Sequence, residues 1–289
     1  MKTRLITAAV LLAVLAVVVW QIYTPALVLV VAFLSAVAAN EIMKCANVKN
    51  KFIVLFGTLV AAITPFFASE HCLEPLVSAQ KWGGVINAVP QTVYIIAVFL
   101  IFFLAMLKDF KGTSFEDVAV SLLASVAVPF VFSVFVRLRD LQGYKSQLGI
   151  YLIFFALICA LATDSGAQLT GMAFGKHKMA PNISPKKTIE GAAGGLIFSL
   201  ILNFCAVLCY NKFAEKPLDS TVITVLMLCS LPVSFLGMMG DLAASVLKRN
   251  FGVKDFGKIF PGHGGVMDRF DSTLFTMSAT YALALVCFI

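Results

Sequence analysis

Residues 220–240 have the sequence STVITVLMLCSLPVSFLGMMG, and residues 241–271 continue as DLAASVLKRNFGVKDFGKIFPGHGGVMDRFD. The first stretch has no charged residue and matches the length of about 20 residues that a helix needs to cross a hydrocarbon core. The second stretch gathers cations, acids and glycines, and another apolar run follows from about residue 267. This order predicts two membrane helices joined by a polar segment at the membrane surface.

The rest of the chain repeats this alternation. Its 289 residues are 60% hydrophobic and 13% charged, whereas soluble domains contain about 25% charged residues. The apolar runs also lack the strict alternation of a membrane β-barrel. We therefore predict an all-α fold, a polytopic helical bundle of about nine transmembrane helices, or seven or eight if one of the first two runs does not cross. The runs lie at about 5–20, 24–39, 52–68, 86–107, 115–136, 148–171, 189–210, 220–240 and 267–289.

The basic residues predict the orientation and exclude one class of function. With a cytoplasmic N-terminus, nine spans place most of the 22 Lys and Arg residues inside, as the positive-inside rule requires. The loop 137–147 is the exception, because it carries Arg137, Arg139 and Lys145 outside. The bases are scattered over short loops, so the net charge of +7 does not indicate nucleic-acid binding. We expect a single membrane domain, residues 1–289, in which residues 148–289 carry the catalytic motifs.

The polar segment begins on a helix. If that helix continues past residue 240, Asp241, Ser245 and Lys248 or Arg249 share one face. The residues from Gly252 to Gly265 are then predicted to form a loop whose glycines let backbone amides approach a phosphate.

The polar segment ends at the start of the last helix, where Asp268 and Asp271 lie on one side next to Arg269. A charged loop that contacts anionic lipid heads is the alternative. It explains the lysines, but it does not explain His263-Gly-Gly or the acids at the membrane boundary.

Asp164 interrupts an apolar run from Leu148 to Phe174. An acid inside a membrane costs about 2.5–3.5 kcal/mol, so Asp164 requires a partner. Carboxylates beside many cations suit a site for Mg²⁺ and a polyphosphate. A structural hydrogen bond to a neighbouring helix is the alternative.

The segment 175–191 adds further cations. We predict that Ser184 caps a helix with Pro185 at its first position, so that Lys186, Lys187 and Glu190 lie in the first turn. Lysines there oppose the helix dipole unless an anion docks at the helix N-terminus. Enforcement of membrane topology is the alternative explanation.

These motifs resemble those of the phosphatidate cytidylyltransferases, also called CDP-diacylglycerol synthases. No serine-hydrolase, zinc-protease or P-loop motif is present. The resemblance rests on Ser245, Lys248-Arg249, Lys254-Asp255, Gly257, Pro261, His263-Gly264-Gly265 and Asp268-Arg269-Phe270-Asp271, and upstream on Asp164-Ser-Gly-Ala, Phe174-Gly-Lys176 and residues 184–191.

The resemblance implies transfer of CMP from CTP to phosphatidic acid, giving CDP-diacylglycerol and pyrophosphate. It further implies a divalent metal, which we expect to be Mg²⁺, and a homodimer, and it leaves open whether a monovalent ion such as K⁺ shares the site. We expect the protein to lie in the bacterial cytoplasmic (inner) membrane, and the distribution of basic residues predicts an active site that faces the cytoplasm. The expected metal ligands are Asp241, Asp268, Asp164 and Asp271. The other catalytic residues are expected to be Lys248, Arg249, Lys254, Asp255, His263 and Arg269, and the substrate-binding residues Lys186, Lys187, Ser245, Lys258, Gly264 and Gly265.

Two other functions stay open. The same charges would serve an enzyme that acts on another membrane lipid, such as a polyprenyl phosphate or an archaeal ether lipid, or a lipid kinase. A transporter for an anionic solute would also need charged groups within helices. It would be expected to have paired broken helices in two related halves, and no such symmetry is visible in the sequence.

Overall fold

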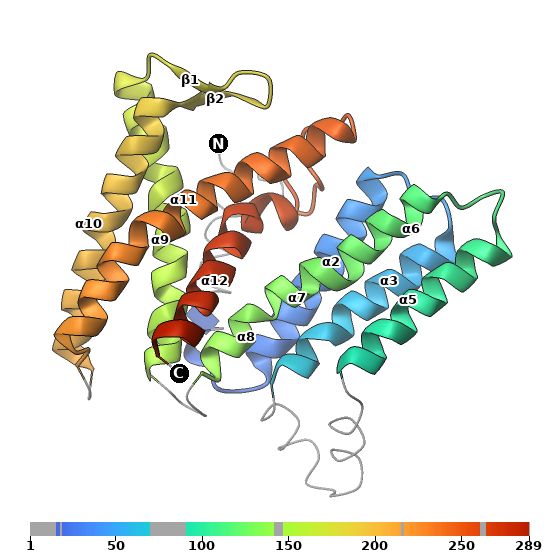
Figure 1. Ribbon diagram of the computed structural model, residues 1–289, viewed down its shortest axis with the longest axis horizontal. Coiled ribbons are helices and arrows are strands. Elements are labelled where there is room, and N and C mark those ends of the chain that lie inside the picture. Colours follow the sequence, from blue (N-terminus) through green and yellow to red (C-terminus); the bar gives the residue numbers. More distant parts are fainter. Residues whose placement is uncertain are drawn as a thin grey trace, which may run out of the picture. The chain divides into compact units, whose positions relative to one another are not determined.

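A computed structural model describes residues 16, 17, 19–69, 91–141, 147–214, 217–260 and 264–288, which are almost entirely helical (Figure 1). Within them, seven helices are long and apolar enough to cross a membrane, and Thr92–Lys108 is a shorter apolar helix. The all-α polytopic membrane fold is therefore confirmed. The predicted run at 5–20 lies mostly outside the described residues, so the count of nine spans is not confirmed.

The chain divides into two compact units. Unit 1 contains Met1–Asp140 and Asp255–Asp268, and unit 2 contains Leu141–Lys254 and Arg269–Ile289. Most of the polar loop between the last two helices thus belongs to the unit built by the N-terminal half of the chain. The expectation of a single membrane domain stays a prediction.

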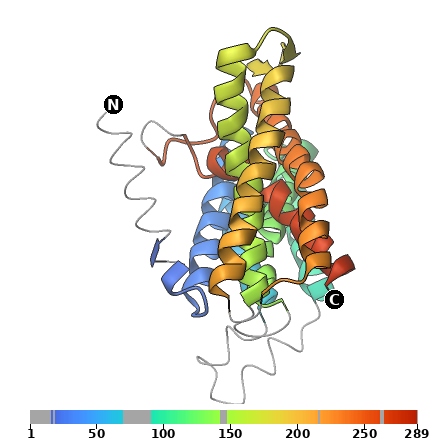
Figure 2. The same cartoon turned by 90° about the vertical axis from the view of Figure 1, so that its left-hand side faces the viewer.

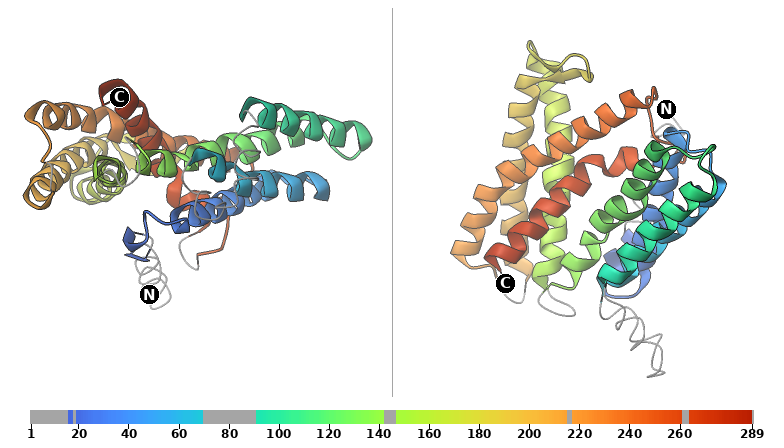
Figure 3. Two further views of the ribbon diagram at one scale, coloured as in Figure 1. Left: turned by 90° about the horizontal axis from the view of Figure 1, so that it is seen from below. Right: turned by 45° about the vertical axis from the view of Figure 1, so that its right-hand side comes forward.

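Unit 1 is a group of antiparallel helices (Figure 3). A hydrophobic core joins three of these helices. It consists of Ile53 and Val60 from the helix 51–63, Val98 and Phe102 from the helix 91–108, and Val118 from the helix 115–122. Asn50 starts one helix by accepting hydrogen bonds from the next backbone N–H groups, as a helix cap does. The elements are α2 (Ala26–Cys45), α3 (Lys51–Ile63), η1 (Thr64–Ala68), α5 (Gln91–Lys108), α6 (Phe115–Leu122), η2 (Leu123–Ala127), α7 (Val128–Phe132) and α8 (Val134–Arg139).

Arg139 is one of the three bases that the predicted orientation places outside, in the loop 137–147. Its side chain is 2% exposed, and its guanidinium lies 2.7 Å from the Asp140 carboxylate. It also donates hydrogen bonds to the Ser69 hydroxyl and to the carbonyls of Ile22 and Thr24. This cation is part of the packing of unit 1, so it says little about the side on which the loop lies.

Unit 2 contains the longest helices. Its elements are α9 (Gln147–Phe174), β1 (Lys178–Ala180), β2 (Ser184–Thr188), α10 (Ile189–Phe213), α11 (Ser220–Asn250) and the greater part of α12 (Met267–Cys287). Figure 2 shows α9 and α10 side by side, with the β1–β2 hairpin at their ends.

Small residues allow α9 and α10 to approach each other closely. A Cβ atom at Gly195 would lie 2.6 Å from the Thr163 carbonyl oxygen, and one at Gly166 would lie 2.6 Å from the Phe198 Cβ. Close helix contact through small residues is typical of membrane bundles. The contact holds α9 rigidly beside the hairpin that leads into α10.

The predicted helix start at Ser184 is wrong. Residues Ser184–Thr188 form a strand that pairs antiparallel with Lys178–Ala180. The N-cap is Thr188, whose hydroxyl accepts a hydrogen bond from the Gly191 N–H at 3.1 Å. Lys186 and Lys187 therefore lie on β2 and not in the first turn of α10, because Thr188 offers the same capping chemistry directly beside the apolar run. Glu190 is in the first turn, as predicted.

Candidate active site

The helix α11 is the main scaffold of the site. It continues without a break from Ser220 to Asn250, so the predicted extension past residue 240 is confirmed. Asp241, Ser245 and Lys248 consequently lie on one face, one turn apart. Asp219 is the N-cap of this helix: its carboxylate accepts a hydrogen bond from the Thr221 N–H, and this bond lowers the pKa of Asp219.

The β1–β2 hairpin holds the predicted lysines beside α11. Glu190, at the start of α10, accepts hydrogen bonds from the backbone N–H groups of Lys176 and His177. Its carboxylate also lies 2.6 Å from the His177 ring Nδ1. These contacts tie the beginning of the hairpin to its end and so fix the strand that carries Lys186 and Lys187.

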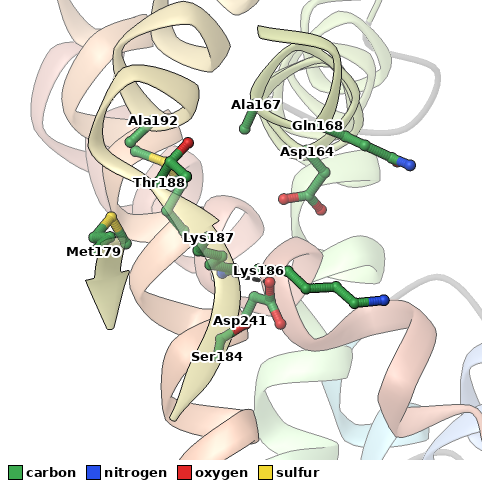
Figure 4. Close-up of a pocket in the computed structure, with 11 residues that line it drawn as sticks. Asp164, Ala167, Gln168, Met179, Ser184, Lys186, Lys187, Thr188, Ala192 and Asp241 are labelled. Atoms are coloured by element: carbon green, nitrogen blue, oxygen red, sulfur yellow. Dashed lines mark ion pairs between the residues drawn. The ribbon is translucent and has the colours of Figure 1, made fainter. Parts of the chain in front are cut away.

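A cavity of about 320 Å³ lies within unit 2 between these elements. Asp164, Ala167 and Gln168 line it from α9, and Asp241 lines it from α11. Lys186 and Lys187 line it from β2, with their side chains extending in different directions, as the alternation along a strand requires (Figure 4). The structure thus brings together two of the expected metal ligands and two of the expected substrate-binding lysines.

An ion pair crosses this cavity. The Lys187 Nζ lies 2.5 Å from the Asp241 Oδ2, and the two side chains are 25% and 26% exposed. Within the described residues, this buried ammonium has no other polar partner. The pair places Lys187 of the segment 176–187 next to Asp241, the first residue of the segment 241–268.

Asp164 has both a structural partner and a place in the cavity. Its Oδ2 accepts a hydrogen bond of 3.0 Å from the Ser272 hydroxyl on α12. The alternative interpretation of this acid, a hydrogen bond to a neighbouring helix, is therefore correct for one oxygen. Lys187 and Arg269 are the cations whose charge acts on its carboxylate.

Asp271 adds a third acid to the electrostatics of unit 2. It is 8% exposed, and its Oδ1 accepts a hydrogen bond from the Ser272 N–H. The charges that act on it are the acids Asp241 and Asp164 and the base Lys248. Acids from α9, α11 and α12 therefore repel one another, and a cation would relieve that repulsion.

The carboxylates that line the cavity are compatible with a bound magnesium ion. No three His, Cys, Asp or Glu side chains are arranged to hold a metal ion in the part of the chain that the structure describes. Mg²⁺ is usually bound by one or two carboxylates, with phosphates and water as the other ligands. Asp164 and Asp241, which line one cavity, would supply the two carboxylates.

Asp268 has a different set of contacts, in unit 1. Its Oδ2 accepts hydrogen bonds from the Phe256 N–H at 2.8 Å and the Gly265 N–H at 2.9 Å. It therefore closes the polar loop at both ends. Gly264 has a φ of +89°, and a Cβ atom there would lie 2.9 Å from the same oxygen, so a glycine is needed at this position.

The model of the cytidylyltransferase family matches residues 2–287. The chain belongs to this family. It is 41% identical over 170 residues to a phosphatidate cytidylyltransferase of Bacillus subtilis (strain 168), a match that covers 59% of each chain. It is 42% identical over 164 residues to proteins of the same name from Staphylococcus haemolyticus (strain JCSC1435) and Staphylococcus aureus (strain COL), which covers 57% of this chain and 58% of theirs. The matches thus span less than two thirds of these relatives.

One buried acid of this cytidylyltransferase-family protein was not predicted. Glu41 on α2 is 6% exposed, and its carboxylate accepts hydrogen bonds from the backbone N–H groups of Val266 and Met267. The sequence contains a signal for it. Glu41 lies at the end of an apolar run, and an acid at the membrane is costly unless it has a partner, as was argued for Asp164. Its partners, 225 and 226 residues away, were not visible in the sequence.

The remaining predicted residues lie on both units of the family member. In unit 2, Ser245 and Lys248 are half-buried, and the exposed residues are Arg249, Lys254 and Arg269. In unit 1, Asp255 and Lys258 are exposed, Gly264 is half-buried and Gly265 is buried. His263 lies outside the described residues.

Proposed function

We propose that this cytidylyltransferase-family protein transfers CMP from CTP to phosphatidic acid, giving CDP-diacylglycerol and pyrophosphate. The observation that carries the proposal is the cavity of unit 2, in which lysines from β2 meet carboxylates from α9 and α11. The names of the relatives support the choice of nucleotide and lipid.

The reaction requires two polyanions to meet. The phosphate monoester of phosphatidic acid is an anionic nucleophile, and its oxygen forms a bond to the α-phosphorus of CTP while the bond to pyrophosphate breaks. No serine or cysteine nucleophile is needed, so the protein's task is to position the two phosphates and offset their repulsion.

Lys186 and Lys187 are proposed to supply part of the positive charge that offsets the repulsion between the two phosphates. The Lys187 ammonium pairs with Asp241. A phosphate that enters the cavity offers it a second anionic partner, and the carboxylate of Asp241 then becomes available to a cation. Lys248 on the same face of α11, together with Arg249, Lys254, Lys258 and Arg269, is proposed to bind the triphosphate and the leaving pyrophosphate.

Asp241 and Asp164 are proposed to hold Mg²⁺, and the motif adds Asp268 and Asp271 to the ligand set. When bound, the ion would neutralise charge on the phosphates and orient them for in-line attack. A monovalent ion such as K⁺ is proposed only as an open second cofactor of the same site.

The proposed location is the bacterial cytoplasmic membrane, with the cavity open to the cytoplasm. The distribution of Lys and Arg over the loops supports this orientation. Assembly as a homodimer is proposed from the resemblance alone.

The experiment is to incubate purified protein with labelled CTP and one lipid at a time: phosphatidic acid, a polyprenyl phosphate, an ether-linked analogue or diacylglycerol. We expect a nucleotide-linked lipid and pyrophosphate with phosphatidic acid only. A product formed preferentially with polyprenyl phosphate or the ether lipid would refute the substrate. Phosphorylation of diacylglycerol would indicate a kinase, and solute uptake into proteoliposomes without CTP would indicate a transporter.

A further inference from the structure

Glu41 belongs to the N-terminal half of the chain, yet it binds the start of the last helix. Its Oε1 accepts a hydrogen bond from the Val266 N–H and its Oε2 one from the Met267 N–H, each at 3.1 Å. The first N–H groups of a helix have no partner within the helix, and its positive end favours a carboxylate. Glu41 therefore fixes the first turn of α12, where Asp268 is the next residue.

Two glycines of the polar loop pack directly against this carboxylate. A Cβ atom at Gly257 or at Gly265 would overlap the Glu41 side-chain oxygens. One turn further along α2, the Cys45 thiol donates a hydrogen bond to the Phe256 carbonyl at 3.1 Å. These two glycines thus admit the carboxylate of Glu41, whereas the approach of the loop glycines to a phosphate stays a prediction.

The same segment is held from its other side by Asp268. Its Oδ2 binds the N–H groups of Phe256 and Gly265, as described above. Gly265 is thus fixed by a hydrogen bond to one carboxylate and by close packing against the other. Movement of Glu41 would consequently displace the loop and the Asp268 carboxylate together.

Glu41 also borders a cavity of about 350 Å³ within unit 1. Lys258, which is proposed above to bind the triphosphate, lines this cavity, as do Lys44 and Asn40. The loop backbone that carries Lys258 follows directly after Gly257, so the contact with Glu41 bears on the position of that lysine as well.

We propose that Glu41 is a positioning residue for the reaction: it holds residues 255–260 and 264–268 in the conformation in which Asp268 and Lys258 act. This inference rests on the proposed function, although the contact itself can be tested without it. Glu41 touches no reacting atom and acts through the loop.

The experiment compares hydrogen exchange of the 255–268 segment and steady-state kinetics in Glu41→Gln, Glu41→Ala and wild type. Gln keeps the shape and one acceptor oxygen but presents an NH₂ group to the second backbone donor. We expect exchange to become about tenfold faster or more in Gln, and faster still in Ala, because one and then two buried donors lose their acceptor. The kcat should fall by about 10- to 100-fold, with less than about a threefold change in the KM for CTP.

Glu116→Gln is the matched control, since Glu116 is an exposed acid in the first turn of α6 in the same unit. It should leave both exchange and kcat at wild-type values. Gly257→Ala tests the contact from the opposite side if the Glu41 variants do not fold, and it should reproduce the kcat loss by pushing the carboxylate out of place.

Faster exchange with an unchanged kcat would show that Glu41 only stabilises the fold, and this result would overturn the inference. Unchanged exchange in Glu41→Ala would overturn the contact itself. A wild-type protein that exchanges as described but does not turn over CTP would refute the proposed function, while the exchange data would still decide whether Glu41 holds the loop.

Discussion

The replacement Asp241→Asn removes the charge that faces the Lys187 ammonium, and Lys187→Met removes the other half of the pair. The Lys187 Nζ and the Asp241 Oδ2 lie 2.5 Å apart, and each of the two side chains is about one quarter exposed. Exposed ion pairs contribute about 0.2–1 kcal/mol, whereas breaking a fully buried pair costs about 3–5 kcal/mol. For this partly buried pair we expect a coupling free energy of about 1–3 kcal/mol, between those limits.

The two single variants should differ. After Asp241→Asn, Lys187 still has Asp164 in the same cavity, so part of the attraction remains. After Lys187→Met, Asp241 and Asp164 lose that cation while Asp271 still repels both. The lysine replacement should therefore destabilise the protein more than the aspartate replacement.

The assay is a double-mutant cycle on the purified protein in detergent, with the free energy of unfolding measured for wild type, both single variants and the double variant. Asp219→Asn is the matched control, because it makes the same chemical change at an N-cap of the same helix, where Asn is an equally good cap. A coupling below about 0.3 kcal/mol, which is within the range of independent sites, would refute the ion pair.

Three further predictions concern other parts of the molecule. Arg139→Met should lower the free energy of unfolding by about 3–5 kcal/mol, measured by denaturation, because Asp140 loses its buried cation; a loss below 1 kcal/mol would contradict this. Thr188→Ala should cost about 1 kcal/mol in the same measurement through loss of the α10 cap, and Thr188→Ser should not. Removal of divalent ions with a chelator should abolish nucleotide transfer, and added Mg²⁺ should restore it; full activity in the chelator would refute the metal proposal.

The positions of the helices could be predicted because long apolar runs have few other solutions in a membrane. Asp164 could be predicted for a related reason, since an acid inside such a run needs a partner. The structure places it in a cavity with Asp241, and it also supplies the hydrogen bond to Ser272 that the sequence could not distinguish from a ligand role.

Two kinds of feature could not be predicted: contacts between residues far apart in the sequence, and the choice between two neighbouring residues that can both cap a helix. The start of α10 was placed four residues too early, because Ser184-Pro185 and Thr188 both offer capping chemistry and only the pairing with Lys178–Ala180 decides between them. The role of Glu41 depends on a loop more than 200 residues away.

Pyrophosphate release from CTP by the purified protein in detergent tests the proposed function most directly. We predict release that requires phosphatidic acid and Mg²⁺, that is abolished in Asp241→Asn, and that stays near the wild-type rate in Asp219→Asn. Release that does not depend on the lipid, or a rate in Asp241→Asn equal to that of the wild type, would contradict the proposal that this cavity joins CTP to phosphatidic acid.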